Sequence, residues 1–425
     1  PSDRRGWWLI GLGAVYAGLA WLLRRGRGRE RHPTADLDPG DRRQTPLQAY
    51  ATPPLVMAFV LIALGLPPSS LDKVGAFWAY LAAALIYAAL AAWLRQPLLT
   101  VATAGLLAVP YGVALVWLDV DRANYGLALF PGVIAALVLA HLLDGRLGRP
   151  EALFPSRDPK SWRLAALLDW WAAPWYAWGY TGALVAVGLT LRLTPERTYL
   201  LLAEMWLESM RLAAALVLAA CAFLHATSRF RSRAALLLGG ALAQMAALAV
   251  IDAYRAYGLF IYASQAALAF LPVTLLTAAL ALAVQSRRGE GSPLSTAWFQ
   301  GWSRPLYLLL AVDLLLGQAA ALRGSEPGAV VTTAHALLLA LLATIWLQPL
   351  LAYTAVGLGI AGLVQAMTWS GAEFLTYPVG LALLALGYGL LAYGLAYAGK
   401  SDRTKIWLKP LEWTALGLSA VALLW

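Results

Sequence analysis

The sequence has little charge and almost no cysteine. Charged residues make up 13% of the 425 residues and apolar residues 61%, whereas soluble proteins are about a quarter charged. A chain with so few charges cannot cover a water-facing surface, so a soluble globular protein is excluded. The single cysteine, Cys221, excludes an intramolecular disulfide and a cysteine-based metal cluster.

Motifs that identify common enzymes are also absent. The sequence has no phosphate-binding glycine-rich loop, no His-Glu-x-x-His metalloprotease motif and no serine nucleophile elbow. The net charge is +10, but the basic residues lie in short segments between apolar runs rather than on one charged surface, so no nucleic acid is expected as a partner. We expect membrane lipids to surround the chain, and we expect no cofactor.

Long apolar runs dominate what is present. A helix needs about 20 apolar residues to cross a bilayer, and the sequence contains fourteen runs near that length. They predict an all-α integral membrane protein with about 14 transmembrane helices. It stays open whether the short runs at 53–68 and 410–425 cross the membrane fully. The runs are 7–23, 53–68, 75–94, 97–118, 126–143, 173–191, 199–225, 234–252, 258–285, 305–322, 329–347, 349–369, 375–398 and 410–425.

Lys and Arg gather in alternate connections between these runs. Of the 32 basic residues, 23 lie in the connections that follow odd-numbered runs. Short cytoplasmic loops carry an excess of basic residues, so we predict that these connections are cytoplasmic and that the N-terminus is outside, in a plasma membrane of prokaryotic type. A missed span would invert every later loop, so the persistent bias supports the count of runs.

An aromatic residue followed by proline recurs at the start of even-numbered runs, most clearly at Trp346 to Pro349 and Trp407 to Pro410. Proline suits the first turn of a helix, and Trp suits the membrane interface. The copies share one orientation, which predicts roughly seven tandem, parallel two-helix hairpin repeats. A weaker copy runs from Tyr50 to Pro53. We interpret these residues as structural anchors: Trp93, Pro97, Trp171, Pro174, Trp302, Pro305, Trp346, Pro349, Trp407 and Pro410.

Two regions are predicted. Residues 1–52 form an N-terminal transmembrane helix and a charged cytoplasmic loop, and residues 53–425 form the multi-pass region of hairpins. The offset of 252 residues between Pro53 and Pro305, repeated between Pro97 and Pro349, indicates a duplication. The sequence starts at Pro1 rather than Met and stops inside an apolar run, so we expect a piece of a longer protein. Further membrane subunits or a soluble domain are its candidate partners.

Spaced glycines predict close helix packing near the end of the chain. Small residues let helix backbones approach each other in a membrane, although glycine is also generally frequent in membrane helices. The glycines concerned are Gly357, Gly362, Gly380, Gly387 and Gly394.

Ionisable residues inside apolar runs are candidates for function, because each costs at least about 2.5 to 3.5 kcal/mol to insert. Glu204, Glu208 and Arg211 are spaced i, i+4, i+7 and share one helix face. Asp252 and Arg255 lie at the outer end of the next run. Two interpretations stay open: a polar binding or permeation path that opens outward, or a salt-bridge clamp between the two helices.

Asp313 is the most isolated acid, with Gln318 five residues later. Both a proton-coupled role and a hydrogen bond between helices fit it. His141, His225 and His335 stand in apolar context, but no paired spacing supports ligation of haem, chlorophyll or a metal. We favour hydrogen-bonded or interfacial histidines.

Asp119 and Asp121 are weak metal candidates in an outer loop, because hard cations need several oxygen ligands.

Three classes of function therefore remain. We rank first a transport or translocation module for a small or lipid-like substrate. A non-catalytic membrane scaffold or sensing module comes second, and a membrane-embedded transferase that uses a lipid-linked substrate comes third. A role without catalysis is favoured.

Overall fold

All regular structure in the described part of the chain is helical. The computed structural model describes residues 2–25, 46–69, 72–94, 98–144, 171–192, 202–230, 232–255, 258–259, 262–286, 302–322, 326–398 and 401–425. Eleven helices within these ranges are long and apolar enough to cross a membrane. The chain is thus an all-helical, multi-pass membrane protein, as the apolar runs predict.

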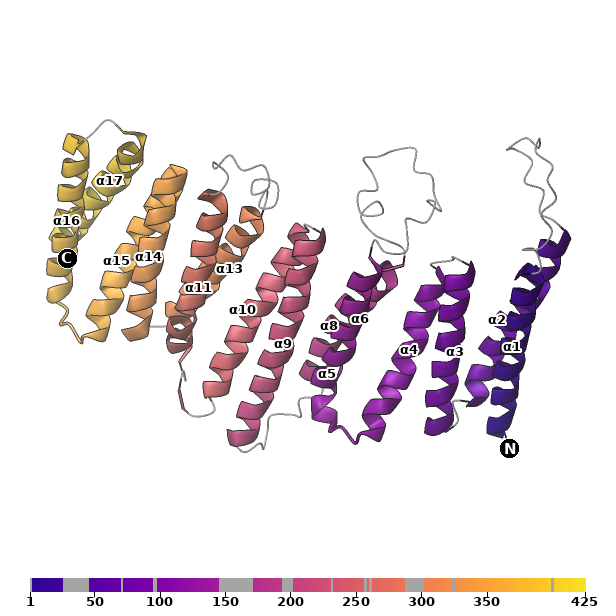
Figure 1. Ribbon diagram of the computed structural model, residues 1–425. Helices are drawn as coiled ribbons and strands as arrows, with labels where there is room; N and C mark the ends of the chain where they lie inside the picture. Colours follow the sequence, from indigo (N-terminus) through magenta and orange to yellow (C-terminus); the bar gives the residue numbers. More distant parts are fainter. Residues whose placement is uncertain are drawn as a thin grey trace, which may run out of the picture. The chain divides into compact units, whose positions relative to one another are not determined.

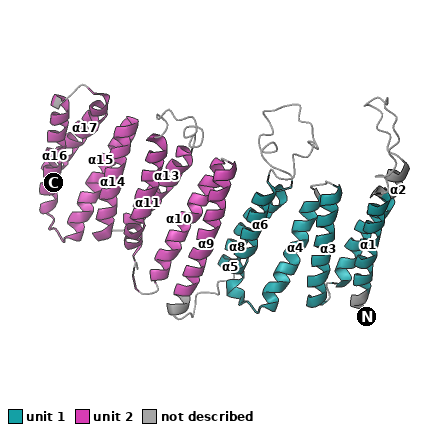
Figure 2. Cartoon of the chain, in the orientation of Figure 1, with its two compact units in different colours: residues 1–193 teal, residues 194–425 magenta. Residues whose placement is uncertain are grey.

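The chain divides into two compact units, Pro1–Leu193 and Thr194–Trp425 (Figure 2). Unit 1 contains α1 (Ser2–Arg25), α2 (Pro46–Ser69), α3 (Lys73–Leu94), α4 (Leu98–Trp117), the short 3-10 helix η2 (Arg122–Asn124), α5 (Tyr125–Ala128), α6 (Phe130–Leu143) and α8 (Ala173–Arg192). Unit 2 contains α9 (Leu202–Phe230), α10 (Arg233–Arg255), α11 (Ala263–Ser286), α13 (Ser303–Ala321), α14 (Glu326–Trp346), α15 (Pro349–Trp369), α16 (Thr376–Ala398) and α17 (Asp402–Leu424) (Figure 1).

Helix lies over each of the fourteen apolar runs, but some boundaries differ. α2 begins at Pro46 and α17 at Asp402, ahead of the predicted starts, so Pro53 and Pro410 lie inside helices. The prediction that these two prolines start helices is wrong. Apolarity marks the part of a helix that lipid surrounds, whereas backbone hydrogen bonding continues beyond it. Of the predicted loop before residue 53, residues 46–52 are therefore helical, and residues 26–45 lie outside the described residues.

Within each unit the helices pack in consecutive pairs that stand side by side (Figure 1). The pairs are α1 with α2, α3 with α4 and α6 with α8 in unit 1, then α9 with α10, α11 with α13, α14 with α15 and α16 with α17 in unit 2. The two helices of a pair run antiparallel (Figure 1). Two or three residues join α3 to α4, α9 to α10, α14 to α15 and α16 to α17, and connections this short require antiparallel neighbours. In each unit, the helix ends that are joined within the pairs therefore lie on one side.

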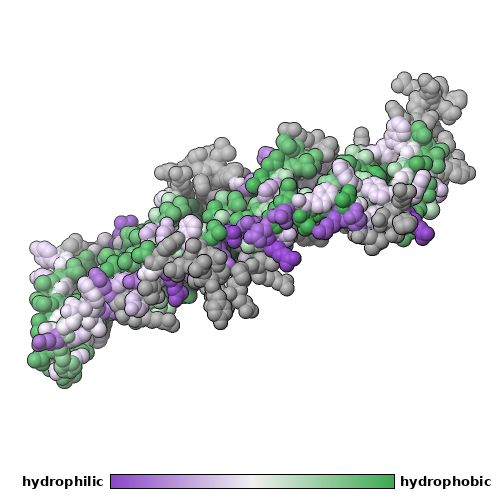
Figure 3. Space-filling view, turned by 90° about the horizontal axis from the view of Figure 1, so that it is seen from below, coloured by the Kyte–Doolittle hydropathy of each residue, from purple (hydrophilic) through white to green (hydrophobic). Residues whose placement is uncertain are grey.

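Large apolar side chains cover much of the described surface. Leu315, Leu337 and Leu350 are 72%, 68% and 75% exposed, and hydrophobic residues fill broad areas in Figure 3. In water such a surface would drive association. Lipid tails are as apolar as leucine, so the surface fits a bilayer.

Only some of the predicted glycines pack closely. A Cβ atom at Gly362 would lie 2.8 Å from Thr333 Oγ1 of α14, and one at Gly380 would lie 2.6 Å from Met367 Sδ of α15. The other three have no neighbouring atom within 4 Å of such a Cβ, so the packing prediction is wrong for Gly357, Gly387 and Gly394. Seven-residue spacing places glycines on one face but does not determine which face meets a neighbour.

Candidate functional site

Asp313 is part of a hydrogen-bonded cluster that joins three helices of unit 2. Its carboxylate Oδ2 accepts a hydrogen bond from Gln244 Nε2 of α10 at 2.8 Å, and the same amide lies 3.3 Å from Thr277 Oγ1 of α11. Asp313 is 5% exposed. A buried polar group is costly unless it is hydrogen-bonded, so these contacts offset the cost of placing an acid here. They join the α9–α10 pair to the α11–α13 pair.

A second cluster on the same helix joins α13 to α14. Gln318 Nε2 donates to Thr332 Oγ1 at 3.0 Å, and Gln318 Oε1 lies 3.2 Å from His335 Nδ1. With the amide in this orientation, Nδ1 carries the proton and donates to Gln318. His335 is 2% exposed, so it sits between helices as a hydrogen-bonded histidine, the role favoured from the sequence.

Two repeat tryptophans also form bonds between neighbouring pairs. Trp346 Nε1 on α14 donates to Gln285 Oε1 on α11 at 3.2 Å, and Tyr307 of α13 donates to the same amide oxygen. Trp407 Nε1 on α17 donates to Thr344 Oγ1 on α14 at 3.1 Å. Trp346 thus bonds to the last turn of α11, and Trp407 bonds to the last turn of α14. In both cases the partner helix is the first helix of the preceding pair.

Other repeat tryptophans pack in equivalent places. Trp93 lies against a cluster that contains Ala17 and Ala58 of the first pair, and Trp302 lies against a cluster that contains Leu236 of α10. Trp171 is 8% exposed. Trp93 and Trp302 thus lie in the seams between pairs. The interfacial anchoring that the sequence suggests stays a prediction.

The repeat prolines occupy different positions in their helices. Pro349 is the first residue of α15, Pro174 the second of α8 and Pro305 the third of α13. Pro410 is internal to α17, and Pro97 lies outside the described residues.

The charged residues near the predicted outer end of α9 and α10 are partly brought together. Asp252 Oδ2 of α10 accepts a hydrogen bond from Ser209 Oγ of α9 at 3.0 Å. Glu208 and Arg211, on the same stretch of α9 as Ser209, are half-buried, and Arg255 is exposed at the end of α10. The side chain of Glu204 lies outside the described residues. Asp252 therefore takes part in a bond between the two helices of one pair.

The loop acids Asp119 and Asp121 are exposed between α4 and η2. Asp121 Oδ1 accepts a hydrogen bond from the backbone N–H of Ala123 at 3.4 Å and caps η2. In the described ranges, no three His, Cys, Asp or Glu side chains are grouped closely enough to hold a metal ion. His141 is exposed and His225 half-buried.

Tyr111 of α4 is a structural residue that sequence reasoning missed. Its hydroxyl donates to the carbonyl of Ala128 and accepts from the N–H of Gly132 at 3.2 Å. In an unbroken helix those two groups would bond each other. Pro131 supplies no N–H and disturbs the ladder here, so the hydroxyl bridges the interruption between α5 and α6.

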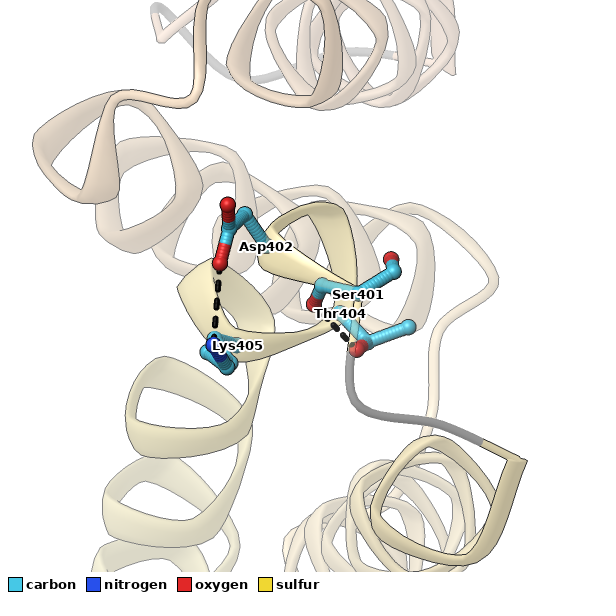
Figure 4. Close-up of polar contacts among 4 residues, drawn as sticks. All are labelled: Ser401, Asp402, Thr404 and Lys405. Atoms are coloured by element: carbon cyan, nitrogen blue, oxygen red, sulfur yellow. Dashed lines mark hydrogen bonds and ion pairs between the residues drawn. The ribbon is translucent and has the colours of Figure 1, made fainter.

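At the start of α17, exposed residues hold the first turn (Figure 4). Lys405 Nζ donates to Asp402 Oδ1 at 2.9 Å, and Thr404 Oγ1 donates to the carbonyl of Ser401 at 2.7 Å. The hydrogen bond from Lys405 and its positive charge lower the pKa of Asp402 below its usual value.

Uncharged polar residues inside the apolar runs are the sequence feature that indicates these contacts between helices. The candidates chosen from the sequence were charged residues, so the amides and hydroxyls were missed. The partners of Asp313, Asp252 and Trp346 are the amide of Gln244, the hydroxyl of Ser209 and the amide of Gln285. Such residues are regular hydrogen-bonding groups between membrane helices, so a list of amides within spans would have found Gln244 and Gln285.

No protein-family model, no curated protein and no solved structure matches this chain. The functional assignment therefore depends on the helix pairs and on the polar groups between them.

Proposed function

We propose that the protein is a non-catalytic membrane scaffold built from seven tandem two-helix hairpins. One observation carries the proposal: several polar side chains of unit 2, among them the buried Asp313, Thr332 and His335, are bonded across the seams between neighbouring pairs. Asp313, the most isolated acid in the apolar runs, is one of these bonded groups. Residues used in this way hold hairpins together and are not arranged around a substrate.

Parallel hairpin repeats suit a scaffold because each added repeat extends a surface rather than closing around a central site. The pairs are ordered along the chain within each unit, and they expose leucine-rich faces. In a bilayer those faces are available to lipids and to helices of other membrane proteins. The scaffold would therefore act by lateral contact.

The proposal includes a topology. The connections within the pairs are those that carry most of the Lys and Arg, and in each unit the helix ends that they join lie on one side (Figure 1). We assign that end to the cytoplasm, because short cytoplasmic loops are enriched in basic residues, and we assign the N-terminus to the outside.

The scaffold is tested by reconstitution into liposomes that contain a pH-sensitive dye, under an imposed pH gradient and a potassium potential. A scaffold predicts proton flux equal to that of empty liposomes, and Asp313→Asn should leave it unchanged.

A photo-crosslinker at exposed Leu337, compared with one at buried Leu338, supplies the positive readout in cell membranes. A scaffold predicts a discrete protein adduct at Leu337 alone, and protein-dependent flux abolished by Asp313→Asn would overturn the proposal.

Transport of a small or lipid-like substrate is the second candidate. The half-buried pair of opposite charges on α9, Glu208 and Arg211, together with Asp252 on α10, favours it, because permeation paths use intramembrane ionisable residues. Glu208→Gln separates the two functions. Transport predicts lost flux with a normal protein level, whereas a clamp predicts a lower level of folded protein.

A further inference from the structure

Arg304 stands unpaired at the start of α13. It is the second residue of the helix, and its side chain is exposed. Among the described residues it has no hydrogen-bond, ion-pair or ring partner. A guanidinium group is always charged and presents five N–H donors, so this positive charge is not compensated within the described part of the protein.

The start of α13 adds to the positive charge. No side chain caps the helix at Trp302, and the first turn contains no acid. The first N–H groups of a helix lack partners within the helix and carry a partial positive charge. α17 differs, because Asp402 lies in its first turn and pairs with Lys405 at 2.9 Å. The start of α13 is therefore suited to an anion, with the guanidinium as the principal group.

Exposed leucines continue the same face of α13 into the membrane. Residues four, eleven and eighteen positions after Arg304 share its face of the helix. They form a leucine stripe of Leu308, Leu315 and Leu322, which are 55%, 72% and 59% exposed. α13 contacts α10 of one neighbouring pair and α14 of the other, so the exposure of this stripe does not come from an end of unit 2.

The length of the stripe matches one leaflet of a bilayer. At 1.5 Å per residue, Arg304 and Leu315 are separated by roughly 16 Å along the helix, and half of the hydrocarbon core is about 15 Å thick. A phospholipid whose phosphate lies at Arg304 would therefore lay an acyl chain along Leu308 and Leu315.

The charges favour a lipid with a net negative charge. A guanidinium group donates paired hydrogen bonds to a phosphate, whereas the amine of a zwitterionic headgroup would meet no acid in the first turn of α13. Basic sites beside membrane helices bind anionic headgroups by the same interactions. We propose that Arg304 and the leucine stripe bind one anionic phospholipid, with its phosphate on the guanidinium and its acyl chain on the leucines.

Photo-crosslinking of the full chain tests the inference. The protein, with a photo-crosslinker in place of Leu308, is reconstituted in phosphatidylcholine liposomes that contain a minor fraction of phosphatidylglycerol. Adducts should contain phosphatidylglycerol well above its bulk fraction, and Arg304→Gln should reduce this enrichment roughly tenfold, because hydrogen bonds to a charged group are lost. Arg304→Lys keeps the charge without the paired donors and should give an intermediate enrichment.

Arg403→Gln is the matched control. Arg403 is the exposed second residue of α17, but Pro410, seven residues later on its face, is buried. This change removes the same charge and should leave the enrichment at Leu308 unchanged. Arg304→Gln should also keep the melting temperature of the wild type in lipid-free detergent, because it removes no described contact.

Three results would overturn the inference: adducts at the bulk lipid composition, equal enrichment in Arg304→Gln and the wild type, or loss of the lipid adduct when inorganic phosphate is added. The last result would assign the site to free phosphate, which has no acyl chain for the leucine stripe. Proton flux, the test of the scaffold, does not involve Arg304, so the two proposals fail independently.

Discussion

Individual polar side chains in this protein act between helices. Asp313, Gln318 and Trp346 each face a hydrogen-bonding group on a neighbouring helix. In the membrane an unpaired polar group costs several kcal/mol, so such bonds fix which helices are neighbours. Their residue types follow from the lack of water, which leaves only protein groups as partners.

The bond between Gln244 and Asp313 predicts a specific pattern of stability. Gln244→Leu removes the donor and leaves a buried acid, so the free energy of unfolding in detergent should fall by about 1 to 3 kcal/mol. The double variant with Asp313→Leu also removes the acid and should recover most of that loss. Additive losses in an SDS unfolding titration would show that the two residues do not act as a pair.

The indole of Trp346 gives a second test. Trp346→Phe keeps an aromatic ring next to Tyr307 but loses the hydrogen bond to Gln285. Hydrogen bonds between membrane helices contribute about 0.6 kcal/mol on average, with a maximum of about 1.7, so a loss in that range is expected. Trp413, which is 66% exposed, is the control, and Trp413→Phe should change the unfolding free energy less. Equal effects would assign both residues to lipid anchoring.

The start of α17 depends on pH through Asp402. Its pKa is lowered by the hydrogen bond from Lys405 and by the positive charge. The ion pair therefore stabilises the folded turn above the pKa of the unfolded carboxyl group, and this contribution is lost as the pH falls through the folded pKa. Lys405→Gln should raise the pKa of Asp402, which carboxyl carbon NMR in micelles can follow. An unchanged pKa would show that the pair does not form in solution.

Helices could be located from the sequence because lipid imposes a simple rule. A run of about 20 apolar residues has no stable alternative to helix within a bilayer, and helix covers all fourteen runs. Helix ends were harder to locate, as Pro53 and Pro410 illustrate, because hydrogen bonding continues past the apolar part. The interruption after α5 needed Tyr111, whose position beside Ala128 follows only from packing.

Two glycines on α15, Gly362 and Gly357, allow a controlled test of helix packing. Ala at Gly362 would crowd Thr333 Oγ1, which is fixed by its bond to the carbonyl of Ala329, so Gly362→Ala should loosen the contact with α14 and lower the melting temperature. Gly357 faces open space, so Gly357→Ala should be neutral or stabilising by up to about 1 kcal/mol. Equal effects in a thermal unfolding assay would contradict this assignment of faces.

For the molecule as a whole, the sequence predicted the class but not the contacts. The composition required a membrane, and the alternation of basic loops required antiparallel neighbours. The partners Gln244 and Asp313 are 69 residues apart in the chain, and no local pattern links them.

The central proposal is that the helices over the fourteen apolar runs, with α5 and α6 counted as one span, cross the membrane as seven hairpins. α2, α8 and α17 are the sharpest test, because they are absent from the eleven helices that meet the length and hydropathy expected of a full span. Single cysteines in the connections, introduced into Cys221→Ser and labelled with a membrane-impermeant maleimide in intact cells, report the side of each loop. We predict strict alternation, with the loops inside each hairpin protected and the loops between hairpins labelled. Two successive connections on the same side of α2 or α8, or α17 with both ends on one side, would contradict the claim.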